Sequence, residues 1–443
     1  MESHPSTTPE SSRRTFLRTA GAAALTAASY SRVMGANDKI NVAVVGLGGR
    51  GQDHMNSLAS IGDVRIAALC DVNQAALERG QAKINANAGY QPKGYGDMKD
   101  VFADKNVDAV SMPLPNHWHA LATIWACQAG KDVYIEKPAC YNMFEGKQMI
   151  AAARKYGRMV QIGSQSRSVP HKIKAMQLLS EGVIGPVHTA KGLCFKRRKS
   201  IGHVADLAAP PPGIDWDKFL GPAPMRPFNE LRFKYNWHWF WDTGNGDIGN
   251  QGVHEMDIAR WGMNLGMPHL ISSTGGKFAY TDDQETPNTQ FASYQYDNRQ
   301  IQFEVRGILT GTEGDLLRRG GNIVGDLFYG TDGWMAIDSM GFQVYKGESS
   351  EKTMDVKNDG TKDTVPHMEN FIAACKSRKH EDLHAEVAIG VASANLVHMA
   401  NISYRLGRTL KFDEAKGSFP GDAEANKMMT REYRKPYVVP EKV

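Results

Sequence analysis

The chain has 443 residues, of which 41% are hydrophobic and 23% charged, and its formal net charge is +4. This length is too great for one compact core and predicts two or three domains, and the small net charge gives no reason to expect a nucleic-acid partner. No apolar run reaches the roughly 18 residues that a membrane span needs. Five scattered cysteines exclude a disulfide framework and argue against a zinc cluster.

The first 38 residues have the parts of an export signal. The stretch SRRTFLRTAGAAALTAAS contains paired arginines, Phe-Leu and a weakly apolar, alanine-rich run, in that order. It resembles the twin-arginine type of bacterial signal peptide. A tail with a chance arginine pair is the alternative. We therefore expect residues 1–38 to direct export, to a periplasmic location, and leave them out of the fold.

Short apolar runs alternate with helical stretches in the next part of the chain. This alternation predicts an α/β domain over residues 39–165, with a parallel, doubly wound sheet and right-handed crossovers. The predicted strands are Ile40–Val45, Val64–Cys70, Ala109–Met112, Val133–Glu136 and Met159–Gly163, and the helices between them cover 51–59, 74–86, 119–129 and 144–156.

A glycine-rich turn follows the first predicted strand and precedes a helix. The sequence GLGGRG fits G-x-G-x-x-G, the pattern of a dinucleotide-binding turn, and its candidate contacts are Gly46, Gly48, Gly49, Arg50 and Gly51. Asp71 closes the second predicted strand, where an acidic side chain binds ribose hydroxyls and favours NAD over NADP. A glycine-rich turn in an unrelated α/β protein is the alternative.

Two more loops leave the carboxyl ends of predicted strands. In an open parallel sheet the ligand lies outside these ends, so both loops are expected to face the cofactor. The candidate contacts in PLPNHWH and EKP are Pro115, Asn116, His119, Glu136 and Lys137. His117 and His119 are two residues apart and have no evident carboxylate or thiol partner, so no metal site is expected.

The rhythm changes after about Gly185. A proline-rich and aromatic segment follows a strand at Val187–Phe195, and clustered strands without intervening helices then predict an antiparallel sheet. They cover Leu270–Tyr280, Thr289–Tyr296, Gln300–Leu309, Asp326–Tyr329, Trp334–Ile337 and Phe342–Tyr345. Helices at His367–Ser377 and Ala385–Leu406 are expected to cover one face of this sheet. Residues 166–443 therefore form the predicted α+β domain, which ends in an extended arm.

Four segments together carry a family resemblance. GLGGRG, PLPNHWH, EKP and QIGSQSRSVPHKIKAMQLLSEGVIGPV, in this order and spacing, resemble the Gfo/Idh/MocA family from about Asn41 to at least Phe412. The resemblance implies a Rossmann domain, a largely antiparallel C-terminal domain for substrate binding and oligomerisation, NAD(P), and sugar or polyol substrates. It also places Lys137 near the nicotinamide. We expect a homo-oligomer, either a dimer or a tetramer.

Lys137 and His254 are the expected catalytic pair. A lysine can accept a hydroxyl proton if burial or a nearby cation lowers its pKa, and histidine titrates near neutral pH. The resemblance places His254 beside the reactive hydroxyl. Many family members have an aspartate four residues before this histidine, whereas this chain has Asn250, an amide that orients but does not exchange protons. Asp247 is the candidate substitute, and both are expected to bind substrate.

Other candidate substrate contacts come from two segments. Arg167, in QSRS, matches a family position near cofactor and substrate. The aromatic stretch WHWFW could stack on a sugar, with Trp239 as the candidate, although aromatic clusters more often form core. The basic stretch KRRK at 196–199 is interpreted as a solvated loop, with an anionic sugar or a neighbouring subunit as its functional alternatives.

The leading hypothesis is an NAD-dependent oxidoreductase that acts on a secondary hydroxyl of a sugar, polyol or glycoside. Outside the cytoplasm no NAD pool would reoxidise its cofactor, so we expect a tightly held cofactor and a cycle without net redox change. A second substrate could close that cycle. Alternatively, oxidation, elimination and re-reduction would make the protein a glycosidase. A sugar-binding protein without catalysis is the third hypothesis.

Overall fold

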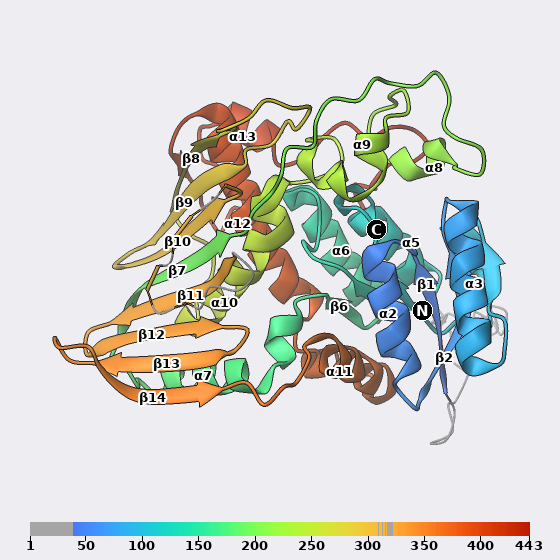
Figure 1. The fold of residues 1–443 in the computed structure, drawn as a ribbon. Helices are drawn as coiled ribbons and strands as arrows, with labels where there is room; N and C mark the ends of the chain where they lie inside the picture. Colours follow the sequence, from blue (N-terminus) through green and yellow to red (C-terminus); the bar gives the residue numbers. More distant parts are fainter. Residues whose placement is uncertain (1–38, 309, 312, 315, 317–321) are drawn as a thin grey trace, which may run out of the picture. The chain divides into compact units, whose positions relative to one another are not determined.

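The computed structural model describes residues 39–308, 310–311, 313–314, 316 and 322–443 (Figure 1). The predicted export signal lies outside these residues. None of the helices in the described ranges is long and apolar enough to cross a membrane.

A six-stranded parallel sheet forms the first part of the fold, with strand order β3-β2-β1-β4-β5-β6. This confirms the predicted parallel α/β architecture. Its strands are β1 (Ile40–Val45), β2 (Val64–Cys70), β3 (Lys93–Tyr95), β4 (Ala109–Met112), β5 (Asp132–Ile135) and β6 (Val160–Ile162). Its helices are α2 (Gly49–Ala59), α3 (Gln74–Ala88), α4 (Met98–Ala103), α5 (His119–Gln128) and α6 (Met143–Tyr156).

Burial explains why these strands read as continuous apolar runs. Val42, Ala43 and Val44 of β1 are all fully buried, as are the four residues of β4, because helices cover both faces of a parallel sheet. Local signals set the helix bounds. The Asn142 side chain accepts a hydrogen bond from the Glu145 N–H at the start of α6, and Gly157 ends that helix in the left-handed conformation.

A nine-stranded mixed sheet forms the second part, with order β14-β13-β12-β11-β7-β10-β9-β8-β15. Neighbouring strands are antiparallel apart from β7 and β10, so the predicted largely antiparallel sheet is confirmed. The strands are β7 (Val187–Phe195), β8 (Leu270–Gly276), β9 (Thr289–Tyr296), β10 (Arg299–Arg306), β11 (Ile323–Gly330), β12 (Gly333–Asp338), β13 (Gly341–Lys346), β14 (Glu351–Lys357) and β15 (Leu410–Lys411).

Three long helices pack on this sheet or beside it: α7 (Pro170–Ser180), α10 (Val253–Met263) and α12 (Val387–Leu406). They bury one apolar face of the sheet in a shared core. Helix α10 lies between the two sheets (Figure 1). Short helices are α8 (Trp216–Leu220), α9 (Glu230–Phe233) and α13 (Ala423–Lys427), and a π-helical turn at Ile248–Gly252 precedes α10.

Helix α11 (Thr364–Ser377) corrects one prediction. We expected it to cover the second sheet with α12, but it packs against α2 and the first sheet. The ring of Phe371 meets the ring of Tyr134 edge-on at 5.9 Å. The buried His367 ring lies 2.9 Å from the carbonyl oxygen of Ile162. The apolar pattern predicted a buried face correctly but could not tell which sheet would bury it.

Candidate active site

The glycine turn has the shape that a dinucleotide needs. Gly46 adopts φ +95°, and a Cβ on Gly51 would lie 2.1 Å from the Gly46 carbonyl oxygen, so neither position accommodates a side chain. At Gly48 and Gly49, by contrast, a Cβ would meet no atom within 4 Å. The turn is therefore tightly packed underneath and open on the side that faces the cavity.

Asp71 closes β2 beside this turn. Its Oδ2 accepts a hydrogen bond from the Leu47 N–H at 2.7 Å, and its Oδ1 accepts one from the Asn73 N–H at 2.8 Å. Both bonds orient the carboxylate, and each oxygen keeps a lone pair for a ribose hydroxyl. Asp71 and the turn line the same cavity, as predicted residues of a dinucleotide site should.

Glu136 is the most heavily bonded carboxylate near the turn. Its Oε1 accepts hydrogen bonds from Arg50 Nε at 2.9 Å and Gln165 Nε2 at 2.9 Å, and lies 3.0 Å from His54 Nε2. Burial alone would raise its pKa, but the charge of Arg50 and the hydrogen bond to His54 hold the pKa of Glu136 well below its usual range. Glu136 therefore anchors Arg50 as a fixed anion.

The loop after β4 has one of its predicted cofactor contacts in the cavity lining and two outside it. Pro115 lines the cavity, whereas Asn116 and His119 are fully enclosed. The Asn116 amide donates to Asn245 Oδ1 at 2.9 Å. The two ring nitrogens of His119 lie 2.6 Å from the Pro138 carbonyl and 2.8 Å from the Leu114 carbonyl. His119 thus braces the two cofactor-facing loops against each other.

His117 is bonded in the same way and does not suggest a metal. Its nitrogens lie 2.9 Å from the Phe219 carbonyl and 3.3 Å from the Thr243 carbonyl. Among the residues that the structure describes, no group of three or more His, Cys, Asp or Glu side chains is placed to hold a metal ion.

Lys137 lines the same cavity as the glycine turn. Its Nζ donates to the Asn250 carbonyl at 2.6 Å and lies 3.4 Å from Asn250 Oδ1. Burial lowers the pKa of Lys137 to about 8, against the opposing charge of Glu136. The Asn250 amide in turn donates to Tyr235 Oη at 2.8 Å. Asn250 therefore orients the lysine, a role that an amide performs without exchanging a proton.

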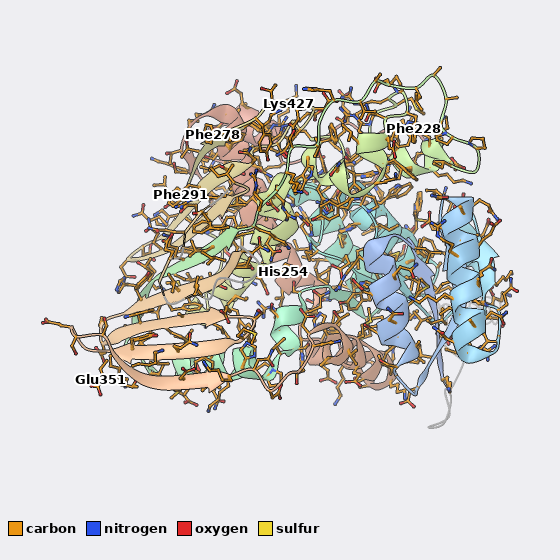
Figure 2. The ribbon with its side chains drawn as sticks, viewed as in Figure 1. Phe228, His254, Phe278, Phe291, Glu351 and Lys427 are labelled. Carbon is orange, nitrogen blue, oxygen red and sulfur yellow. The ribbon has the colours of Figure 1, made fainter. Side chains whose placement is uncertain are left out.

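His254 stands on the first turn of α10 (Figure 2) and lines the same cavity as Lys137. No hydrogen bond joins its ring to the residues within the described ranges, so both nitrogens are available to a ligand. Burial, together with the charge of Lys137, lowers the pKa of His254 to about 3. The imidazole is therefore neutral at physiological pH.

Two predicted substrate contacts are held by ion pairs. Asp247 receives two hydrogen bonds from Arg198, at 2.7 and 3.0 Å. We predicted that the KRRK stretch is a solvated loop, but the side chain of Arg198 in it is only 15% exposed. Arg167 donates to both carboxylate oxygens of Asp257, at 2.7 and 2.9 Å. Arg167 and Asp247 stay outside the cavity lining, one shell behind it.

The aromatic segment divides between core and cavity. Trp239 is 3% exposed and lies under the guanidinium of Arg198, 5.3 Å from ring centre to Cζ. Trp237 and His238 stack on each other, with ring centres 3.5 Å apart, and line the cavity. The surface that faces a ligand is therefore made by Tyr235, Trp237 and His238.

The glycine turn, Asp71, Lys137 and His254 line one cavity of about 1080 Å³. It runs from the glycine turn, past Lys137 and His254, to the second sheet. Sequence reasoning missed the groups at the sheet end: Lys172, Glu255, Asp326 and Asp338. Glu255 is next to His254, which was the one available signal. Asp326 and Lys172 come from separate elements, and no local pattern joined them.

Comparison with known proteins fits this geometry. Residues 40–164 match a family described as an oxidoreductase family with an NAD-binding Rossmann fold. Residues 167–266 and 332–439 match the C-terminal alpha/beta domain of the same family. The chain belongs to the Gfo/Idh/MocA oxidoreductase family. Its first domain is an NAD-binding Rossmann domain, which confirms the cofactor predicted from the turn and Asp71.

Curated relatives match mainly one part of the chain. Inositol 2-dehydrogenase of Salmonella paratyphi B is 32% identical over 148 residues, which are 33% of this chain and 43% of that enzyme. A glycosyl hydrolase family 109 protein of Shewanella sp. is 26% identical over 152 residues, 33% of each chain. The match thus spans less than half the length of either relative.

Solved structures extend the likeness to both domains. The WlbA dehydrogenase of Bordetella pertussis, in complex with NADH and UDP-GlcNAcA, matches with TM-score 0.65 and 19% identity over 85% of this chain and 99% of that chain. Aldose-aldose oxidoreductase of Caulobacter crescentus matches with TM-score 0.62 and 19% identity over 84% of this chain and 100% of that chain. At these identities the likeness shows the fold.

Proposed function

We propose that the protein oxidises a secondary hydroxyl group of a sugar, polyol or glycoside, with NAD held tightly in its cavity. The observation that carries this proposal is the amine of Lys137, which lies between the NAD-binding turn and His254 and has a pKa lowered to about 8. An amine with that pKa is partly neutral near physiological pH and can accept the proton of an alcohol. NAD, when bound, supplies the hydride acceptor.

Each group near the reacting hydroxyl has a distinct part. The Asn250 carbonyl holds one N–H of Lys137, so the lone pair of the neutral amine is free to face the substrate. His254, also neutral, hydrogen-bonds the same hydroxyl and fixes its orientation. Gly48, Gly49 and Asp71 hold the cofactor. Trp237 and His238 offer flat ring faces to the apolar side of a sugar.

The retained cofactor is supported by a cover segment, residues 213–221, whose Lys218 and Phe219 line the same cavity as Asp71. The Asp215 N–H donates to the Val72 carbonyl at 2.9 Å, and the Gln74 N–H donates to the Gly213 carbonyl at 2.9 Å. This segment therefore pairs directly with the turn that follows Asp71.

The C-terminal arm fastens the same cover. Arg434 Nη1 donates to Asp217 Oδ1 at 2.5 Å and its Nε to the Gly221 carbonyl at 2.9 Å, and Tyr437 Oη donates to Asp217 Oδ2 at 2.9 Å. Pro436 and Tyr437 line the cavity themselves. A dinucleotide bound there would be enclosed by three separate segments of the chain.

Export of the folded holoenzyme completes this proposal. The twin-arginine-type signal at residues 1–38 would move a folded protein to the periplasm with its cofactor loaded. A cofactor that stays bound there must be reoxidised in place, which favours a second substrate that accepts the hydride from the reduced cofactor. A dimer or tetramer, as expected from the resemblance, is measured separately by light scattering.

The test begins with protein purified without added nucleotide. We expect NAD to be released on denaturation in near-stoichiometric amount. Added sugars should raise the near-ultraviolet absorbance of reduced nicotinamide.

Arg434→Ala should speed cofactor loss on dialysis about tenfold, because it removes charge-assisted hydrogen bonds from the cover. Arg408→Ala, which removes an exposed pair with Asp422 and Glu424, is the matched control. Freely exchanging NAD would contradict the retained cofactor, and unchanged absorbance with every sugar would contradict the oxidation.

A redox-neutral glycosidase is the second candidate, and the Shewanella relative favours it. In that case the ring oxidation at Lys137 would be followed by elimination of the glycosidic bond and by re-reduction. A para-nitrophenyl glycoside separates the two candidates. Release of nitrophenol without accumulation of reduced nicotinamide would identify the glycosidase, and accumulation without release would identify the oxidoreductase.

A further inference from the structure

Two buried carboxyl groups meet at the sheet end of the cavity. Glu255 belongs to α10, and Asp326 belongs to β11, where it pairs in register with Gly192 of β7. A Cβ at Gly192 would lie 2.8 Å from the Glu255 Cβ and 3.2 Å from Asp326 Oδ1. The missing side chain at Gly192 therefore leaves the space in which helix and sheet bring the two acids together.

These carboxyl groups lack the partners that buried acids normally have. Glu255 is 4% exposed and Asp326 is 0% exposed. Glu255 Oε1 accepts a hydrogen bond from Gln251 Nε2 at 3.2 Å. In the part of the chain that the structure describes, Glu255 Oε2 and both carboxylate oxygens of Asp326 have no hydrogen-bond partner. Unsatisfied buried groups destabilise a fold, so their presence calls for a functional reason.

The residues that carry the unpaired oxygens line the cavity that holds the proposed catalytic pair. Glu255 and Asp326 line it together with Lys137 and His254. Burial raises the pKa of Glu255 to about 7 and the pKa of Asp326 well above its usual range. Such carboxyl groups can both accept and donate hydrogen bonds near neutral pH. A ligand group that reaches these two side chains from the cavity would therefore meet carboxyl oxygens that have no other partner among the described residues.

The surroundings select the chemistry of that ligand. A divalent cation is disfavoured, because the two acids are not joined by a third ligand among the described residues. An organic cation is disfavoured because Lys172 and Lys196 line the same cavity. Neutral hydroxyl groups remain, and they pair with carboxyl oxygens without bringing further charge into the site.

We propose that Glu255 and Asp326 form a carbohydrate subsite that holds two neighbouring hydroxyl groups of the substrate, beside the hydroxyl that faces Lys137 and His254. The subsite rests on the proposed function for the identity of the reacting group. It goes further by assigning specificity: the substrate carries a pair of neighbouring hydroxyls in addition to the reacting one. Simple secondary alcohols would leave both acids unpaired and bind poorly.

The experiment measures binding and reaction separately on the holoenzyme. D-glucose, myo-inositol and para-nitrophenyl glucoside are titrated by calorimetry into the wild type, Glu255→Gln and Asp326→Asn. Each substitution should weaken binding of the sugar that binds wild type about tenfold or more, since it removes a hydrogen bond to a carboxyl group. The limiting rate of bound-NAD reduction should change far less. Glu304→Gln is the control, because this carboxylate pairs with Arg306 on β10 and does not line the cavity.

Stability and deoxy sugars give independent readouts. The free variants should unfold at the same temperature as wild type or higher, because a buried unpaired carboxyl group is replaced by an amide. A deoxy sugar that lacks a contacted hydroxyl should bind wild type weakly and lose nothing further in the variants. This comparison also works if one variant fails to fold.

The outcomes are distinct. Equal sugar binding by wild type and both variants would overturn the subsite, as would a failure of all these sugars to bind wild type. Weaker binding by the variants, in a protein whose NAD no sugar reduces, would support the subsite and contradict the proposed oxidation.

Discussion

The two ends of the cavity differ in how the protein bonds the carboxyl groups that line them. At the cofactor end, Asp71 and Glu136 receive hydrogen bonds from the protein itself, and Gly51 packs directly on the backbone of Gly46. At the sheet end, Asp326 has no partner for either oxygen among the described residues. The carboxylates of the cofactor end are therefore oriented by the protein itself, whereas Asp326 at the sheet end has no such partner in the described residues. Under the proposals above, the cofactor end retains NAD and the sheet end selects the substrate.

Lys137 stands between the two ends, and its removal should have the largest effect. Lys137→Ala should lower the rate of sugar-dependent NAD reduction by about 10²–10⁴-fold, the usual contribution of a positioned base. Cofactor content should not change, because the turn and Asp71 hold the dinucleotide. The measurement is single-turnover absorbance of the holoenzyme. Lys147→Ala, an exposed lysine on α6, is the control. Full activity in Lys137→Ala would remove the lysine from the mechanism.

Gly51→Ala tests how tightly the glycine turn at the cofactor end is packed. The new Cβ would lie 2.1 Å from a backbone oxygen that cannot rotate away, so the turn must shift. We expect a loss of about 1–3 kcal/mol in the free energy of unfolding and a protein purified with little NAD. Urea unfolding and nucleotide content measure both effects. Gly62→Ala, where a Cβ meets no atom within 4 Å, should match wild type. A stable, NAD-loaded Gly51→Ala would show that the turn is not constrained.

The pH dependence gives the smallest and most specific effect. Lys137 accepts a proton only when its amine is neutral, and burial lowers its pKa to about 8. Below that value the rate of NAD reduction should rise about tenfold per pH unit, and above it the rate should level off. His254 has a pKa of about 3 and does not change charge in this range. A flat profile between neutral pH and pH 9 would assign the proton to another group.

The cofactor end of the cavity could be predicted from the sequence, whereas the sheet end could not. The glycine turn, Asp71 and the loops after β4 and β5 are contiguous motifs whose geometry follows from a parallel sheet. Strand β14 escaped prediction because it is an edge strand with mostly exposed, charged side chains. The Glu255–Asp326 pair escaped because it depends on the register of β7 against β11 and on the placement of α10.

Arg167 and Asp247, which do not line the cavity, show a second limit of prediction from sequence. The family resemblance suggested Arg167 as a substrate contact, and Asp247 was the candidate substitute for the family aspartate. In the structure each forms a two-bonded ion pair with a residue of its own chain. A charged side chain looks the same in sequence whether its partner is a ligand or another residue. The partner Arg198 lay in a stretch that composition alone marked as solvated, and only the fold shows its burial.

The hydrogen bond from Lys137 to the Asn250 carbonyl has a thermodynamic consequence. It joins the Rossmann domain to the second domain at the reacting centre. Because burial at this junction lowers the pKa of Lys137, the contact between the domains and the proton on the amine are linked. When a fluctuation separates the domains, the amine returns to water, its pKa rises and it takes up a proton. Contact between the domains therefore becomes more favourable as the pH rises above about 8. Under the proposed mechanism, the group that accepts the substrate proton therefore also links its own protonation to the contact between the domains.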